Sequence, residues 1–368
     1  DYPFEIGESF GDFLSETYIS KKYNSPISIS DRSNDSDKLS IKNTVQYDLY
    51  SPPNPVRKAT IVKARTFMNG KGSETTTKTF FLWGEENPYK TPVISMQLNE
   101  GALFDYEKGI YTAGIDFDNW RTEKPDGAQA IRPDWNNYGR RGRDWEQPVN
   151  IEIFDKNLNS LENLNGGIRI HGNTSRSYVL KSLRLYARSE YDDKNEFEFN
   201  LFDQKIPNSP SPYNKKFKRL MLRGNGSGGF IANDVVFSRL MQPLFVGVAR
   251  IQTAIHFFNG EYWGITAVRD RFDEYHFANN FDLDKDNIVV VGCNGGVCVF
   301  DAKDDTEKDS FKDLEKYIRN NDLSVSSHYE YVENRLDIKS FIDHIVFEIF
   351  AEGDSYEVKY WKTKTKVN

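Results

Sequence analysis

Residues 166–191 read GGIRIHGNTSRSYVLKSLRLYARSEY, and they form the most informative stretch of the chain. Apolar and polar residues alternate on both sides of a polar Gly-Asn-Thr-Ser segment, a pattern that predicts two short β-strands joined by a turn. Cations crowd this hairpin, namely Arg169, His171, Arg176, Lys181 and Arg184. A hairpin folds without such charge, so the cluster needs a local explanation.

Lys181 is the most unusual of these cations because it stands among apolar residues in YVLKSLRLY. A lysine in a strand is usually a solvated surface residue. Here Arg169 and His171 lie on the preceding strand, and Gly172-Asn173 can expose backbone amides at the turn. A group of Lys, Arg and amide donors is what an anionic phosphate requires. We therefore take Lys181, Arg169, His171, Gly172, Asn173 and Arg184 as candidate phosphate-binding residues.

The totals limit the classes of protein to consider. The chain has 368 residues, a formal charge of −7 and 14% aromatic residues, so it can build a core in two or three domains. Its negative charge argues against a general nucleic-acid coat, and we predict no nucleic-acid partner. The arginine run in 137–148 is better explained by pairing with nearby acids such as Asp144 and Glu146.

The location of the protein is predicted from three features. No run of 18 apolar residues exists, which predicts no membrane span. The chain begins at Asp1 without Met or an apolar leader, which suggests a processed secreted protein. Cys293 and Cys298, the two cysteines, could close a tight disulfide loop or remain free thiols.

The order of predicted elements indicates an α+β protein with a mostly antiparallel sheet and two lobes. Apolar and polar residues alternate in segments of 1–86, which predicts an all-β, sandwich-like accessory module. A second domain is predicted over 91–368. Asn259-Gly260 predicts a tight turn between strands at 250–260 and 261–270. Helices are predicted at 231–246, 271–279, 306–320, 328–334 and 337–351.

Common catalytic motifs are absent. The chain has no Walker spacing, no GxGxxG, no HExxH and no GxSxG, and its Gly-rich stretch at 222–229 resembles a mobile loop more than a phosphate cradle. Paired carboxylates for glycoside hydrolysis stay possible because Asp and Glu are abundant.

Several long segments in a fixed order resemble the spore-coat-protein-H (CotH) kinase-like family over roughly 93–362. They are the hairpin at 166–191, FKRLMLRG with NDVVFSRL, FFNGEYWGITAVRDRFDEYHF, and DIKSFIDHIVFEIFAEGDSYEVKYWK. The first 86 residues resemble, more weakly, a chitobiase C-terminal-like or Fn3-associated β-sandwich through TIVKARTFMNGKGSETTTKTFFL, and we expect this module to be incomplete at its start.

The resemblance implies an atypical protein-kinase-like fold that uses ATP with Mg²⁺ or Mn²⁺ to phosphorylate Ser or Thr of a coat or extracellular assembly protein at the cell or spore surface. It implies that Lys181 is the phosphate lysine and that the strand at 265–270, with Arg269, lies beside adenine. Asp354 matches the candidate catalytic base of the family. These roles suit phosphoryl transfer, which depends mainly on positioning and charge neutralisation.

The chain departs from the family pattern near its end. Tyr356-Glu357 replaces a pair of asparagines, so Glu357 becomes the candidate metal ligand. No DLD-type aspartate motif follows Asp354 before Asn368. We therefore expect a domain that is incomplete at its C-terminal end, with an activity that this departure puts in question.

A second hypothesis is a non-catalytic extracellular module that binds protein or polysaccharide on the same fold. It would expose Trp120, Trp135 and Trp145 as stacking platforms. Ordinary packing of these tryptophans is the competing explanation.

Overall fold

The computed structural model describes residues 20–40, 52, 54–84, 87–123, 133–224, 231–244, 246–294, 297–300, 306–352 and 358–363. The chain divides into two compact units. The barrel unit comprises Asp1–Leu201, Phe217–Val235 and Gln252–Arg269, and the helical unit comprises Phe202–Lys216, Val236–Ile251 and Asp270–Asn368.

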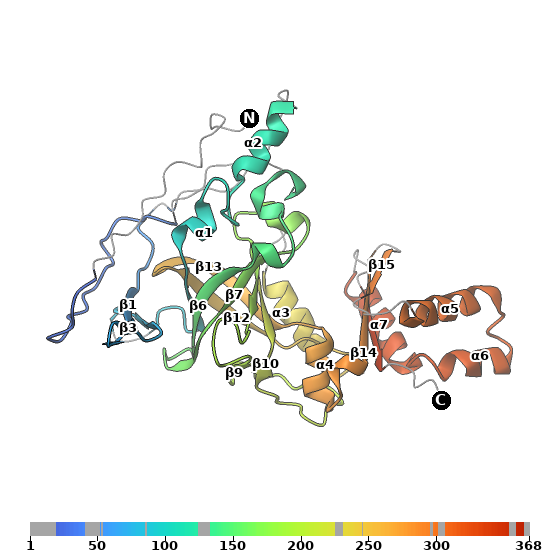
Figure 1. Ribbon diagram of the computed structural model, residues 1–368. Helices are drawn as coiled ribbons and strands as arrows, with labels where there is room; N and C mark the ends of the chain where they lie inside the picture. Colours follow the sequence, from blue (N-terminus) through green and yellow to red (C-terminus); the bar gives the residue numbers. More distant parts are fainter. Residues whose placement is uncertain are drawn as a thin grey trace. The chain divides into compact units, whose positions relative to one another are not determined.

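A closed barrel is the centre of the first unit (Figure 1), and its strand order is β11-β13-β12-β5-β6-β7-β8. These strands are β5 (Val93–Gln97), β6 (Gln147–Phe154), β7 (Ser160–His171), β8 (Ser182–Tyr186), β11 (Arg219–Arg223), β12 (Ile251–Phe258) and β13 (Glu261–Asp270). Neighbouring strands are antiparallel at β5–β6, β6–β7, β7–β8 and β8–β11, whereas β12 and β5 are parallel. The mixed α and β content confirms an α+β protein, but the sheet closes, which the strand pattern alone did not predict.

The two faces of the barrel wall carry different residues because side chains alternate along a strand. On β7 and β8, Ile168 faces Leu185 and Ile170 faces Leu183 across the ladder, and all four side chains are buried. The alternate positions pair Arg169 with Arg184. Arg169 and Arg184 thus lie on the opposite face of the strands from these apolar residues, whereas Lys181 is buried and directly precedes β8.

The described part of residues 1–86 holds two small antiparallel sheets. Their strands are β1 (Thr60–Ala64) with β4 (Thr76–Phe80), and β2 (Phe67–Met68) with β3 (Lys71–Gly72). Phe81 and Trp83 pack on Phe257 of the barrel. The Glu261 carboxylate accepts hydrogen bonds from the backbone N–H groups of 38–40 at 2.7–3.0 Å. This segment therefore belongs to the same compact unit as the barrel.

Short helices occupy the long segment between β5 and β6. They are α1 (Glu100–Phe104), α2 (Gly114–Glu123), and the 3-10 turns η1 (Pro133–Trp135), η2 (Asn137–Gly139) and η3 (Arg143–Trp145). Another turn, η4 (Thr174–Ser177), interrupts the predicted hairpin between β7 and β8. The segment that joins these strands is therefore longer and more structured than a simple turn. The two-stranded sheet of β9 (Phe197–Glu198) and β10 (Lys216–Phe217) follows in the chain.

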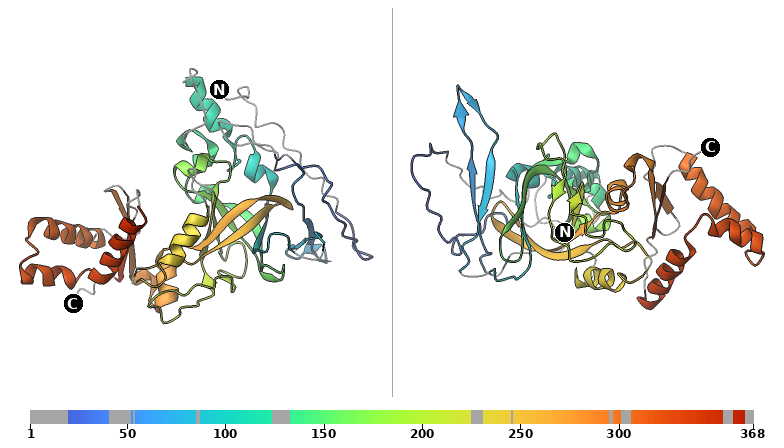
Figure 2. Two further views of the ribbon diagram at one scale, coloured as in Figure 1. Left: turned by 180° about the vertical axis from the view of Figure 1, so that it is seen from behind. Right: turned by 90° about the horizontal axis from the view of Figure 1, so that it is seen from below.

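The second unit is mainly helical. Its elements are α4 (Glu274–Phe281), η5 (Lys285–Asn287), β14 (Ile288–Asn294), β15 (Val297–Phe300), α5 (Thr306–Asn320), α6 (Ser326–Glu333), α7 (Ile338–Phe350) and β16 (Val358–Thr363), while α3 (Ile231–Leu240) begins in the barrel unit. The helices α5 and α6 are antiparallel neighbours in Figure 1 and in the left view of Figure 2. Tyr317 stacks on Tyr331 with 3.8 Å between ring centroids. β14 lies between β15 and β16 in a three-stranded sheet.

The register of β14 and β15 places Cys293 opposite Cys298, and Cys293 is disulfide-bonded. Of the two states that the sequence had left open, a disulfide and free thiols, the structure shows the disulfide. Among the described helices, none combines the length and the apolar character that a membrane span requires.

Candidate anion-binding site

Lys181 is buried at the start of β8 rather than exposed on a strand. It is 1% exposed, and its ammonium donates hydrogen bonds to the backbone oxygens of Arg176 at 2.7 Å and Tyr178 at 3.0 Å. Its Nζ also lies 4.0 Å from the ring centroid of Tyr138 and 5.2 Å from that of Tyr111. Burial, and then repulsion from Arg176, lower the pKa of Lys181 well below its usual value.

Arg176 is the second buried cation of this site, with 5% exposure. Its guanidinium donates to the backbone oxygens of Gly172 at 2.7 Å, Tyr138 at 2.9 Å and Arg140 at 3.1 Å. Burial lowers the pKa of Arg176 to about 10, and repulsion from Arg141, Arg184 and Arg169 acts in the same direction. Carbonyl dipoles therefore hold this guanidinium inside a cluster of like charges.

Three further arginines, Arg141, Arg184 and Arg169, lie near Arg176. Arg184 donates to Nδ1 of His171 at 2.7 Å, and since a guanidinium has no acceptor, that nitrogen must be the acceptor and His171 must carry its proton on Nε2. Arg141 is exposed and donates to the Gly172 oxygen at 3.2 Å and the Asn173 side-chain oxygen at 3.1 Å. No carboxylate of the described residues pairs with Arg184, Arg176 or Lys181.

Glu146 is the acid that partly compensates this charge, and its side chain is 1% exposed. Arg188 donates to both of its carboxylate oxygens, from Nε at 2.7 Å and from Nη2 at 3.0 Å. Arg169 lies 3.3 Å from it, and Arg143 lies 3.9 Å away. The sequence had predicted that the arginine run pairs with nearby acids, and Glu146 is one of those partners. Arg140 instead binds Asp116.

The backbone at Gly172 gives the site its shape. Gly172 has φ of +107°, a conformation that residues with a side chain rarely adopt, and an added Cβ would lie 2.1 Å from the Ser175 hydroxyl oxygen. The turn directs the Gly172 carbonyl at Arg176 and Arg141. This carbonyl holds two of the cations, whereas the sequence analysis had considered only the amide groups of Gly172-Asn173.

The structure brings most of the predicted residues together and leaves others elsewhere. Gly172, Asn173 and Lys181 belong to the 172–181 segment, and His171 directly precedes it and contacts Arg184. Arg169 and Arg184 lie close enough to Arg176 to lower its pKa, but on the opposite face of the strands from Leu183 and Leu185. Arg269 is half-buried on β13, which β11 separates from β8 in the barrel order. Asp354 and Glu357 lie outside the described residues.

Sequence reasoning did not select Arg141, Tyr138 or Glu146 for this site, and it named Arg176 without giving it a role. Tyr138, Arg141 and Glu146 precede the hairpin by about twenty to thirty residues in the printed sequence. The GRRGRDWE run was the available signal, since clustered arginines near another cationic segment indicate a shared site or a shared acid. The antiparallel pairing of β6 with β7, which places Gln147 opposite Ile168, brings these two segments together.

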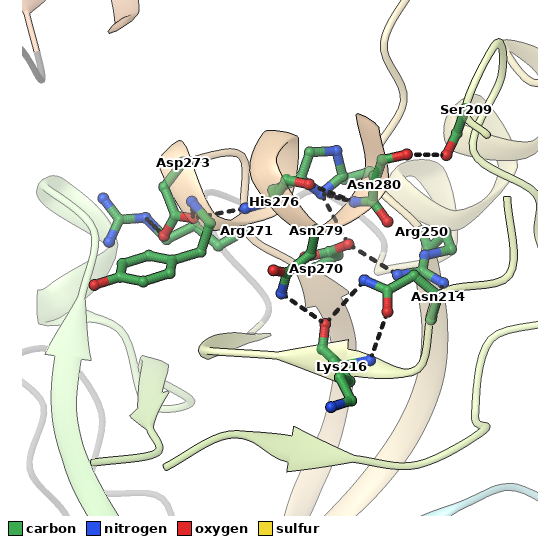
Figure 3. Close-up of polar contacts among 12 residues, drawn as sticks. Ser209, Asn214, Lys216, Arg250, Asp270, Arg271, Asp273, His276, Asn279 and Asn280 are labelled. Carbon is green, nitrogen blue, oxygen red and sulfur yellow. Dashed lines mark hydrogen bonds and ion pairs between the residues drawn. The ribbon is translucent and has the colours of Figure 1, made fainter. Parts of the chain in front are cut away.

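A second cluster of buried charge lies in the helical unit (Figure 3). The Asp270 carboxylate accepts from Arg250 at 3.1 Å and lies 2.9 Å from Nδ1 of His276. Asn280 donates to the His276 oxygen at 2.7 Å. Burial acts to raise the pKa of Asp270, but His276 and Arg250 outweigh burial and lower it. The Asp273 side chain caps the N-terminus of α4 by accepting from the backbone N–H groups of Tyr275 and His276. His276 therefore connects this helix cap to the buried charges.

No group of three or more His, Cys, Asp or Glu side chains that could hold a metal occurs in the described ranges. The tryptophans of the alternative hypothesis take part in packing. Trp120 and Trp135 stack with 3.8 Å between centroids, Trp120 packs on the cluster of Ala113, Phe117 and Tyr138, and Trp145 lies beneath the Arg140 guanidinium at 4.0 Å. These contacts favour packing as the role of the three rings.

Comparison with protein families finds a match to this chain. A model described as CotH kinase protein matches residues 168–367, which is more than half of the chain and includes Lys181, Arg176 and Asp354. A comparison with curated proteins finds no match. The chain belongs to the CotH kinase protein family.

Proposed function

We propose that this protein binds ATP at the cluster around Lys181 and transfers the γ-phosphate to Ser or Thr of a partner protein. The observation that carries the proposal is the excess of buried cations: Lys181 and Arg176 are 1% and 5% exposed and have no carboxylate partner in the part of the chain that the structure describes. Burying cations without counter-charge costs free energy, so such a site is expected to serve an anion.

The donors around the segment 172–181 fit the phosphates of a nucleotide. Lys181 offers an ammonium, and Arg141 and Arg184 offer guanidinium groups that bind oxyanions in a bidentate manner. Arg169 adds a guanidinium that already shares the Glu146 carboxylate. Phosphoryl transfer is catalysed chiefly by positioning and by charge neutralisation, which this set of donors supplies.

The remaining components of the mechanism are inferred from the family. Asp354 would accept the proton of the substrate hydroxyl as general base, and Glu357 would contribute to a site for Mg²⁺ or Mn²⁺. Such a cation supplies charge neutralisation between the phosphates when it is bound. Arg269 and the strand at 265–270 would lie beside the adenine.

The disulfide at Cys293 supports an extracellular location, since disulfides persist in oxidising compartments. We infer secretion or attachment to the cell or spore surface, with a coat or extracellular assembly protein as substrate and polysaccharide as a further possible ligand. The family of coat-associated kinases motivates the choice of protein substrate.

The test is transfer of radiolabelled γ-phosphate from ATP, with Mg²⁺ or Mn²⁺, to the chain itself and to casein as a generic acceptor. We expect Lys181→Met and Asp354→Asn to reduce transfer at least a hundredfold. Lys156→Met is the matched control because Lys156 is exposed in the turn after β6. Transfer that persists in Lys181→Met would refute the assignment, and absence of both binding and transfer in the unmodified chain would favour a non-catalytic scaffold.

A further inference from the structure

Residues 172–178, which we call the latch segment, cover Lys181. The two acceptors of its ammonium, the oxygens of Arg176 and Tyr178, both belong to this segment. The lysine is 1% exposed, and the rings of Tyr138 and Tyr111 also lie against its ammonium. These carbonyls use two of the three N–H donors of the ammonium, and the burial of the side chain keeps a phosphate from reaching the third. A binding event at Lys181 therefore requires its surroundings to move.

Arg176 fixes the latch segment in place. Its side chain binds Gly172 at the start of the segment and the oxygens of Tyr138 and Arg140, which lie outside the segment in and after η2. The Arg176 amide also donates to the Asn173 oxygen at 3.1 Å. The Arg176 side chain therefore joins the start of the latch segment to its middle and also binds the segment to the neighbouring turn η2. The backbone carbonyl of the same residue accepts from Lys181.

The closed arrangement carries an electrostatic cost. Arg176 and Lys181 repel each other, and Arg141, Arg184 and Arg169 add to the repulsion at Arg176. An anion with several negative charges offsets this repulsion and offers both cations a stronger partner than a neutral carbonyl. The same anion therefore favours the open over the closed segment.

We propose that Arg176 is a positioning residue that holds Lys181 in a closed state, and that a polyphosphate anion releases the latch segment to expose the lysine. This inference rests on the proposed function, because it regulates the same site. If Lys181 were only a structural lysine, the segment would have no reason to open when an anion binds.

The experiment measures acylation of Lys181 by acetic anhydride at pH 8, with peptide mass spectrometry and Lys156 as the reference amine within each molecule. A lysine whose pKa is lowered is a good nucleophile once it is accessible, so the rate reports opening. We expect Lys181 to react at least tenfold more slowly than Lys156 in the unmodified chain. Arg176→Gln should raise the Lys181 rate at least fivefold.

Two variants keep this comparison interpretable. Arg143→Gln is the matched control, because Arg143 is about half exposed and pairs with Glu190 outside the latch segment. Arg176→Lys keeps the charge but lacks the planar fork that reaches several carbonyls, so it should raise the rate as Arg176→Gln does. If near-ultraviolet circular dichroism shows that Arg176→Gln does not fold, the comparison is made with Arg176→Lys instead.

Inorganic tripolyphosphate tests release. In the unmodified chain it should accelerate amide hydrogen exchange over 172–178 while it slows acylation of Lys181, because the anion then occupies the ammonium. Slower exchange in the segment would show that the anion tightens the closed state and would overturn the proposal.

The outcomes separate this inference from the proposed function. Equal Lys181 rates in the unmodified chain and Arg176→Gln, together with calorimetric binding of ATP, would overturn the latch and leave the function standing. Faster acylation in Arg176→Gln without binding of ATP or tripolyphosphate would support Arg176 as the positioning residue and count against both the function and release by an anion.

Discussion

His256 is a fully buried residue on β12, and neither ring nitrogen has a hydrogen-bond partner among the described residues. It pairs in register with Ile94 and lies beside Phe258, so apolar groups surround it. Burial lowers its pKa to about 3. The imidazole therefore stays neutral in the folded protein at every pH where the protein is expected to work.

This burial predicts a loss of stability in acid. The unfolded chain takes up a proton below a pKa of about 6.5, whereas the folded chain does so only near pH 3, so the free energy of unfolding decreases as pH falls between those values. His256→Leu removes the effect. Its stability relative to the unmodified chain should rise by about 2 kcal/mol from pH 7 to pH 5, measured by urea unfolding. The same gain in His328→Leu, or no gain in His256→Leu, would contradict the explanation.

Asp270 differs from His256 because it is buried as a charged group and has partners. Asp270→Asn removes the carboxylate that binds Arg250, a residue that is 1% exposed, and should cost about 3–5 kcal/mol in the free energy of unfolding. Asp203→Asn removes the partner of Arg239 in a pair that is 45% and 67% exposed, so it should cost less than about 1 kcal/mol. Urea unfolding of both variants checks the contrast, and equal losses would show that burial is not the deciding factor.

At the scale of elements, the sequence predicted turns and helices whose conformation depends on residues that are neighbours in the chain. The Asn259-Gly260 turn joins β12 to β13 with φ values of 47° and 86°, as expected for a two-residue hairpin turn. The helix predicted over 306–320 matches α5, whose apolar residues recur at helical spacing. The predicted helix at 231–246 ends at Leu240, where a turn replaces its last residues.

Elements that depend on distant partners were not predicted. The helices α1 and α2 are five and ten residues long and lie in a polar segment without a clear period. β14 pairs with β16 about seventy residues later, a contact that no local signal encodes. For the same reason the cation cluster of the hairpin was visible in the sequence, whereas Arg141 and Glu146 reach it only through the fold.

The hairpin turns supply a prediction with an internal control. Gly260 and Gly70 both follow an asparagine and have positive φ values of 86° and 76°. A Cβ at Gly260 would lie 2.5 Å from the Ala59 oxygen, whereas nothing lies within 4 Å of one at Gly70. Gly260→Ala should therefore cost about 1–3 kcal/mol more than Gly70→Ala in thermal or urea unfolding. Similar costs would mean that the backbone conformation alone matters.

At the scale of the whole molecule, the barrel unit carries the cation cluster, and the segment with Asp354 follows α7 in the chain. The barrel sequence alternates as its sheet requires, but its closure and the single parallel pair depend on contacts between residues 93–97 and 251–258. A kinase-like pair of lobes stays a prediction. Membership of the CotH kinase family motivates the proposal that the barrel cluster serves phosphoryl transfer.

The most direct test of the central claim is calorimetric titration of the chain with ATP and Mg²⁺, beside Lys181→Met and the control Lys156→Met. We predict metal-dependent binding by the unmodified chain and the control, and at least tenfold weaker binding by Lys181→Met. Equal binding by Lys181→Met and the control would show that the nucleotide does not use the buried cluster, and no binding at millimolar ATP by any of the three would contradict the nucleotide site altogether.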